Sequence, residues 1–243
     1  MDTSKTADVR INDTILAPLE RTALQWLCKR MPVWTTPDLL TVIGLIGGLV
    51  MAAAYWLCNT NKNFLWIVDL GLLINWFGDS LDGSLARYRR IERFQYGYFV
   101  DHTVDITTQT IFFLGLGFSP FVHFNVALLT LVGYLHLGIL TYINTAVSGV
   151  YKISYGKIGP TEVRVFLLGV NAIFYFVSNP LINLGRVSIS SFDAMVLCIA
   201  TAFFIYFLGF MFLRMRELNI QDPPKENRSR SQSYQAGVSR KVV

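Results

Sequence analysis

Long apolar segments separated by short polar connections dominate the chain. A helix needs roughly 20 apolar residues to cross a bilayer core about 30 Å thick, and six segments approach or reach that length. They are residues 39–58, 64–77 with a charged continuation, 104–122, 126–143, 163–177 and 194–213. The pattern predicts an all-α integral membrane protein with six transmembrane helices in residues 37–218.

An amphipathic segment, residues 14–31, precedes the first apolar one. Its apolar side chains recur at helical spacing and are Leu16, Leu19, Ala23, Leu27 and Met31. We predict an interfacial helix lying on the cytoplasmic membrane surface. The alternative is a short cytoplasmic helix packed on the protein's own loops. Residues 1–13 are predicted to be a polar N-terminus, and the basic residues 219–243 a disordered tail.

Composition agrees with a membrane location and accounts for the net charge. Hydrophobic residues make up 53% of the chain and charged residues 15%, against about 25% charged residues in soluble domains. The net charge of +5 arises from lysines and arginines that gather before span one, after spans two and four, and after span six. This positive-inside distribution places both termini in the cytoplasm and requires no nucleic-acid partner. A bacterial inner membrane and an organelle membrane fit it equally.

Four aspartates interrupt the apolar pattern at the cytoplasmic ends of spans two and three. Asp79 and Asp82 are three residues apart, and Asp101 and Asp105 are four apart, so each pair shares one face of a helix. A short basic loop joins the two helices, which makes them antiparallel neighbours. The two carboxylate pairs are therefore predicted to face each other near the cytoplasmic side.

Four ionised carboxylates in a small site of low dielectric need compensating positive charge. An all-oxygen ligand set suits a hard divalent cation such as Mg²⁺, Mn²⁺ or Ca²⁺, and four carboxylates favour two ions. Two such ions can clamp a phosphoryl group during a displacement. The alternative is that the acids pair with the loop residues Arg87, Arg89 and Arg90. The cysteines and histidines show no zinc-binding spacing.

Small and basic residues accompany the acids at fixed spacing. Gly83, Ala86 and Gly97 leave room for a flat or phosphorylated ligand, and Arg87 offers a bidentate donor to phosphate. Read together as D-x2-D-G-x2-A-R-x9-G-x3-D-x3-D, residues 79 to 105 resemble the signature of the CDP-alcohol phosphatidyltransferase family. Six spans after an interfacial helix also fit that family.

The resemblance implies a reaction, a set of site residues and an assembly. Such enzymes transfer a phosphate-linked alcohol from a CDP-activated donor to an acceptor hydroxyl, release CMP, and are expected to form homodimers. The implied ligands for two Mg²⁺ or Mn²⁺ ions are Asp79, Asp82, Asp101 and Asp105. The implied CDP-pocket residues are Gly83, Ala86, Arg87 and Gly97. Asp105 is the implied base that deprotonates the acceptor.

The residue after the third acid bears on the substrate. The segment "FVDHTVD" places His102 after Asp101, and it resembles the choline and ethanolamine phosphotransferases, which use diacylglycerol as acceptor. We therefore favour CDP-choline or CDP-ethanolamine as donor. His102 is then either a base or a residue that hydrogen-bonds to the metal ligands. The alternative follows from the compact six-span size, which resembles bacterial members that transfer phosphatidyl from CDP-diacylglycerol to a small polar alcohol.

A second polar cluster, "KIGPTEVR", begins span five on the same side as the aspartates. Thr161, Glu162 and Arg164 either bind an acceptor head group or pair with the basic loop, and a helix start that Pro160 and Thr161 favour is the alternative. Asn75, one helical turn before Asp79, is expected to support that ligand.

Two hypotheses of other classes also account for acids at membrane depth. Intramembrane carboxylates mark ion pathways, which would suit a divalent-cation transporter. A member of the family that had lost activity would serve as a scaffold, although the intact signature argues against this.

Overall fold

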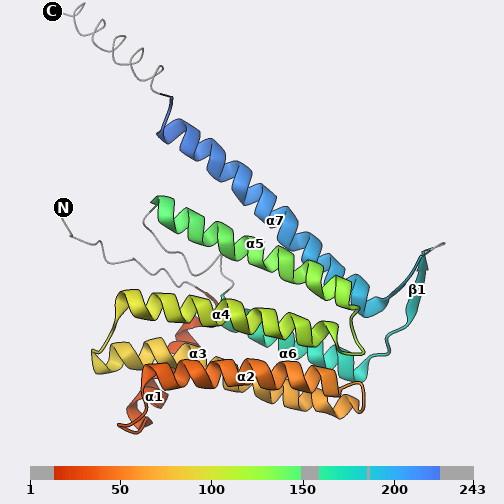
Figure 1. Cartoon of the computed structure of the whole chain (residues 1–243), viewed down its shortest axis with the longest axis horizontal. Coiled ribbons are helices and arrows are strands. Elements are labelled where there is room, and N and C mark those ends of the chain that lie inside the picture. Colours follow the sequence, from red (N-terminus) through yellow and green to blue (C-terminus); the bar gives the residue numbers. More distant parts are fainter. Residues whose placement is uncertain (1–13, 149–158, 185–186, 225–243) are drawn as a thin grey trace, which may run out of the picture. The chain divides into compact units, whose positions relative to one another are not determined.

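The computed structural model describes residues 14–148, 159–184 and 187–224 and consists almost entirely of helices (Figure 1). The helices are α1 (Ala17–Arg30), α2 (Pro37–Leu57), the 3-10 turn η1 (Lys62–Phe64), α3 (Leu65–Arg89), α4 (Phe94–Gly117), α5 (Phe124–Ser148), α6 (Pro160–Phe176) and α7 (Ser191–Gln221). Strands β1 (Leu181–Leu184) and β2 (Val187–Ser190) pair antiparallel between α6 and α7. The predicted N-terminal segment 1–13, and the predicted tail beyond residue 224, lie outside the described residues.

Four of these helices are long and apolar enough to cross a membrane by length and composition, namely α2, α3 with η1, α5 and α7. They correspond to predicted spans one, two, four and six. The remaining two predicted spans fall on α4 and α6. Helix α4 carries Asp101, His102 and Asp105 in its first half, and α6 has only 17 residues. The prediction of six spans is thus confirmed for four helices.

The chain divides into two compact units, residues 1–203 and residues 204–243. The boundary falls within α7, which continues as one helix to Gln221. All the helices that carry predicted site residues belong to the first unit.

Close backbone contact joins α2 to α3 and α4. A Cβ added to Gly47 would lie 2.5 Å from the Asn75 nitrogen and 2.7 Å from the Gly71 oxygen, both on α3. A Cβ on Gly48 would lie 2.7 Å from the Thr108 methyl on α4. Small residues let membrane helices approach this closely. The small-residue face of α2 therefore fixes the spacing of the two helices that carry the four aspartates.

Helix α1 packs against α3. Leu24 and Cys28 of α1 are buried in one cluster with Leu81 and Leu85 of α3. Leu19, on the predicted apolar stripe, is 72% exposed. The helix therefore has apolar residues on two sides: Leu24 and Cys28 pack against α3, and Leu19 is exposed on the surface. Its predicted place on the membrane surface stays a prediction.

We predict that Gly47→Ala destabilises the protein. The added methyl group would meet α3 backbone that cannot rotate away, and overpacking of this kind costs about 1–3 kcal/mol. Thermal unfolding in detergent, followed by circular dichroism, should show a lower midpoint. Gly138→Ala on α5 is the matched control, because a Cβ there meets nothing within 4 Å. An unchanged midpoint for Gly47→Ala would contradict the proposed helix contact.

Candidate active site

A tight helix stop ends α3, and α4 runs back antiparallel to it (Figure 1). Arg90 adopts the left-handed conformation, with φ of 58°. The Ile91 nitrogen donates to the Ala86 oxygen over 3.0 Å, and the Arg90 nitrogen donates to the Arg87 oxygen over 3.1 Å. These two bonds form a Schellman motif, which ends α3 sharply, so that α4 begins at Phe94. The last turns of α3 thereby face the first turns of α4, as the sequence predicts.

Three of the four predicted ligands meet in one place, which we call the aspartate cluster: Asp79, Asp101 and Asp105. Each offers a carboxylate oxygen, and these oxygens lie within 4.8 Å of one another. All three residues are partly buried. A compact set of carboxylate oxygens from two helices fits a hard divalent cation such as Mg²⁺ or Mn²⁺.

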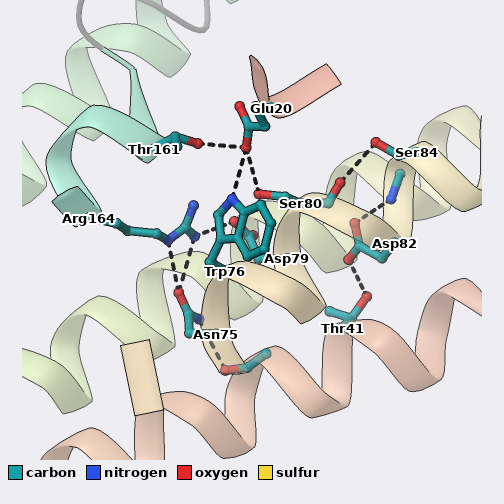
Figure 2. Close-up of polar contacts among 12 residues, drawn as sticks. Glu20, Thr41, Asn75, Trp76, Asp79, Ser80, Asp82, Ser84, Thr161 and Arg164 are labelled. Carbon is teal, nitrogen blue, oxygen red and sulfur yellow. Dashed lines mark hydrogen bonds and ion pairs between the residues drawn. The ribbon is translucent and has the colours of Figure 1, made fainter. Parts of the chain in front are cut away.

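The fourth predicted ligand, Asp82, makes different contacts. Its Oδ2 accepts a hydrogen bond from the Thr41 hydroxyl of α2 over 2.6 Å (Figure 2). Its Oδ1 accepts from the backbone nitrogen of Gly83. The side chain is buried and lies outside the three-residue cluster. Metal binding by Asp82 stays a prediction, and Thr41 is a partner that the sequence analysis did not identify.

An arginine from α6 neutralises one member of the cluster. Arg164 forms an ion pair with Asp79 through its Nη2. It also donates to the Asn75 side-chain oxygen over 3.1 Å from Nη2 and 3.3 Å from Nε. The Nη1 of Arg164 is buried and has no hydrogen-bond partner among the described residues. The sequence placed Arg164 only on the same side as the aspartates and did not predict this ion pair, and the roles of Asn75 and Arg164 in the site stay predictions.

Two arginines that the alternative interpretation pairs with the acids lie in the last turn of α3 and contact other groups. Arg89 donates to the backbone oxygens of Pro32 over 2.7 Å and of Met31 over 3.2 Å. Arg87 donates to the Ser84 hydroxyl over 3.2 Å. Arg89 thus fastens the connection between α1 and α2 to the end of α3.

The other start-of-helix residues of α6 bind α1. Thr161 donates to Glu20 over 2.6 Å. Glu162 accepts from the Leu16 nitrogen over 2.7 Å and from the Gly159 nitrogen over 2.9 Å. Burial raises the pKa of Glu162, but these backbone donors outweigh it and hold the pKa below its ordinary value. This arrangement supports the helix-start account of both residues, and their role toward an acceptor stays a prediction.

The small residues of the signature lie near the end of α3, at Gly83 and Ala86, and in the first turn of α4, at Gly97. A Cβ on Gly83 would lie 3.4 Å from the Arg87 guanidinium. A Cβ on Gly97 would meet nothing within 4 Å, and Arg87 itself is exposed. Ala86 is half-buried on the same helix. Space beside these residues is compatible with the predicted CDP pocket.

His102 is packed among aromatic rings beside the cluster. Its ring stacks on Tyr98 at a centroid distance of 4.1 Å and lies 5.4 Å from the ring of Tyr142. Its Nδ1 lies 2.9 Å from the Tyr98 carbonyl oxygen. A carbonyl only accepts, so Nδ1 carries the proton and donates. This hydrogen bond ties His102 to its own helix, and both predicted roles, a base and a hydrogen-bond partner of the metal ligands, stay predictions.

Comparison with known proteins places this site in a family. Residues 34–208 match the family model described as CDP-alcohol phosphatidyltransferase. A crystal structure of the phosphatidylinositol phosphate synthase of Mycobacterium tuberculosis with CDP-DAG bound has a TM-score of 0.54 and 19% identity. The alignment covers 79% of this chain and 91% of that one.

The same synthase in complex with manganese and citrate gives a TM-score of 0.52 and 20% identity, over 80% of this chain and 86% of that one. At these identities the likeness shows a shared fold. The matched family segment contains every signature residue from Asp79 to Asp105. The chain therefore belongs to the CDP-alcohol phosphatidyltransferase family and is a phosphotransferase of phospholipid synthesis.

Proposed function

We propose that the protein transfers a phosphatidyl group from CDP-diacylglycerol to the hydroxyl of a small polar alcohol and releases CMP. The observation that carries this proposal is the aspartate cluster, with its oxygens within 4.8 Å of one another, inside the matched family segment. CDP-diacylglycerol is favoured because a structural neighbour was solved with CDP-DAG bound. The earlier preference for CDP-choline or CDP-ethanolamine depends on His102 alone and has no support from these neighbours.

We further propose that Asp79, Asp101 and Asp105 hold a divalent cation, with Asp82 as a ligand if a second ion binds. Mn²⁺ is a reasonable candidate beside Mg²⁺, because a neighbour of the same fold was solved with manganese. Such a cation, when bound, neutralises the diphosphate of the donor and stabilises the leaving CMP phosphate.

The chain's own residues account for binding and proton transfer. The unpartnered Nη1 of Arg164 is a donor for a phosphate oxygen of a substrate. In the transfer, a bond forms between the acceptor oxygen and the phosphatidyl phosphorus, while the bond from that phosphorus to the CMP oxygen breaks. Asp105 takes the proton of the acceptor hydroxyl, as a base within the cluster.

The proposal includes a membrane orientation and an assembly. The distribution of lysine and arginine supports an orientation with both termini and the cluster on the cytoplasmic side. Homodimerisation, which the family resemblance implies, remains part of the proposal. Cross-linking in native membranes would test it.

We predict that purified protein in lipid nanodiscs releases CMP from CDP-diacylglycerol when a small polyol or phosphorylated polyol and Mg²⁺ or Mn²⁺ are present. CDP-choline and CDP-ethanolamine, each with diacylglycerol, form parallel arms, and the lipid product is identified by mass spectrometry. CMP from these two donors alone would overturn the choice of donor. CMP from no donor–acceptor pair, together with metal flux into vesicles, would instead support the transporter alternative.

We predict that Asp105→Asn lowers kcat by about 10²–10⁴-fold, the usual contribution of a general base. Steady-state CMP release measures this change.

Asp101→Asn is expected to weaken Mn²⁺ binding, measured by electron paramagnetic resonance of the ion without any substrate. Asp69→Asn is the matched control, since Asp69 accepts a hydrogen bond from Asn171 on α6 and an asparagine oxygen can do the same. Full activity and Mn²⁺ affinity in Asp101→Asn would disprove its role as a ligand.

A further inference from the structure

One carboxylate of α1 joins three helices beside the aspartate cluster. The Oε1 of Glu20 accepts hydrogen bonds from the Trp76 indole and the Ser80 hydroxyl of α3, each over 3.1 Å. The same oxygen accepts from the Thr161 hydroxyl of α6 over 2.6 Å (Figure 2). A single side chain thus connects α1, α3 and α6.

These three donors lie next to the ion pair of the site. Ser80 directly follows Asp79 on α3, and Thr161 lies one helical turn before Arg164 on α6. Arg164 bridges α6 to α3 directly through Asp79, and Glu20 bridges the same two helices a second time. The contacts form a closed ring: Asp79 pairs with Arg164, and Ser80 beside Asp79 and Thr161 near Arg164 both donate to Glu20.

Glu20 is itself held on both sides along α1. One turn before it, the Leu16 nitrogen donates to Glu162 of α6. One turn after it, Leu24 is buried against Leu81 and Leu85 of α3. Two independent anchors therefore fix the place of the Glu20 carboxylate.

We propose that Glu20 is a positioning residue that holds α6 against α3, so that Arg164 stays on Asp79 and the cluster keeps its spacing. The inference rests on the proposed phosphatidyl transfer. Glu20 lies outside residues 34–208, the segment that matches the family model, and it is no part of the signature. Its carboxylate also adds to the negative charge that Arg164 experiences.

The first test compares the kinetics of substitutions at Glu20. Glu20→Ala is expected to lower kcat by about ten- to a hundredfold, because a small misplacement of reacting groups has effects of that size. The KM for the CDP-linked donor should change less than kcat does, since Glu20 itself touches no ligand and acts only through the position of Arg164. Glu20→Gln should retain most of the activity, because its amide oxygen still accepts hydrogen bonds.

A matched control separates positioning from a general loss of stability. Tyr55→Phe removes a buried hydrogen bond of 2.6 Å between α2 and α6, from Tyr55 to Asn171, without touching the Glu20 contacts. It should lower the unfolding temperature and leave kcat unchanged. Thr161→Val should reduce kcat less than Glu20→Ala does, and the double variant should match Glu20→Ala because the two residues share one interaction.

The second readout needs no substrate. Cysteines introduced at Gln25 of α1 and Val165 of α6, both exposed positions, carry spin labels that report the distance between the two helices. Cys198, an exposed free cysteine, is replaced by serine so that it takes up no label. Glu20→Ala should broaden the distance distribution, whereas Tyr55→Phe should not. If the unsubstituted protein releases no CMP, the proposed reaction fails and this readout still tests the position of α6.

Three results would overturn the proposal. They are an unchanged kcat and distance distribution in Glu20→Ala, an equal fall of kcat in Tyr55→Phe, and a Glu20→Gln variant as impaired as Glu20→Ala.

Discussion

Repulsion among three carboxylates within 4.8 Å of one another is the constraint on which the rest of the site depends. Like charges at this distance repel strongly where water is scarce. Arg164, whose side chain is 14% exposed, compensates the charge of Asp79. Asp101 and Asp105 leave a further negative charge that a divalent cation would balance. A fold that keeps these groups together must resist their tendency to separate.

Backbone packing supplies that resistance. Gly47 brings α2 against the backbone of α3 one turn before Asp79, and Gly48 brings α2 against Thr108 of α4, one turn beyond Asp105. The Schellman motif at Arg90 fixes the turn between the two acidic helices. Helix α6 brings Arg164 to Asp79 and contacts Glu20 of α1 through Thr161. The glycine contacts of α2, the Schellman motif and the hydrogen bonds of Glu20 thus all bear on the positions of the helices that carry the aspartate cluster and Arg164.

Local spacing in the sequence was enough to predict that the aspartates of the two helices face each other. That prediction came from the three- and four-residue intervals of the aspartates and from the short loop between the two spans. The sequence analysis missed contacts that depend on how distant helices meet. Glu20 lay off the apolar stripe of α1, so nothing in its neighbourhood marked it. Asp82 shares a helical face with Asp79, yet the hydroxyl of Thr41, far along the chain, is its partner.

The two predicted spans that were not confirmed, α4 and α6, show how the polar residues of a site lower the hydropathy by which a membrane span is recognised. Helix α4 carries Asp101, His102 and Asp105, whereas α6 has only 17 residues and begins with polar residues that bind Glu20 of α1 and Asp79 of α3. Hydropathy measures the preference of an isolated helix for lipid. Some of their polar groups meet neighbouring helices instead of lipid, as Thr161 meets Glu20 of α1 and Arg164 meets Asp79 of α3. A site built from carboxylates at membrane depth therefore weakens the apolar pattern in the helices that form it.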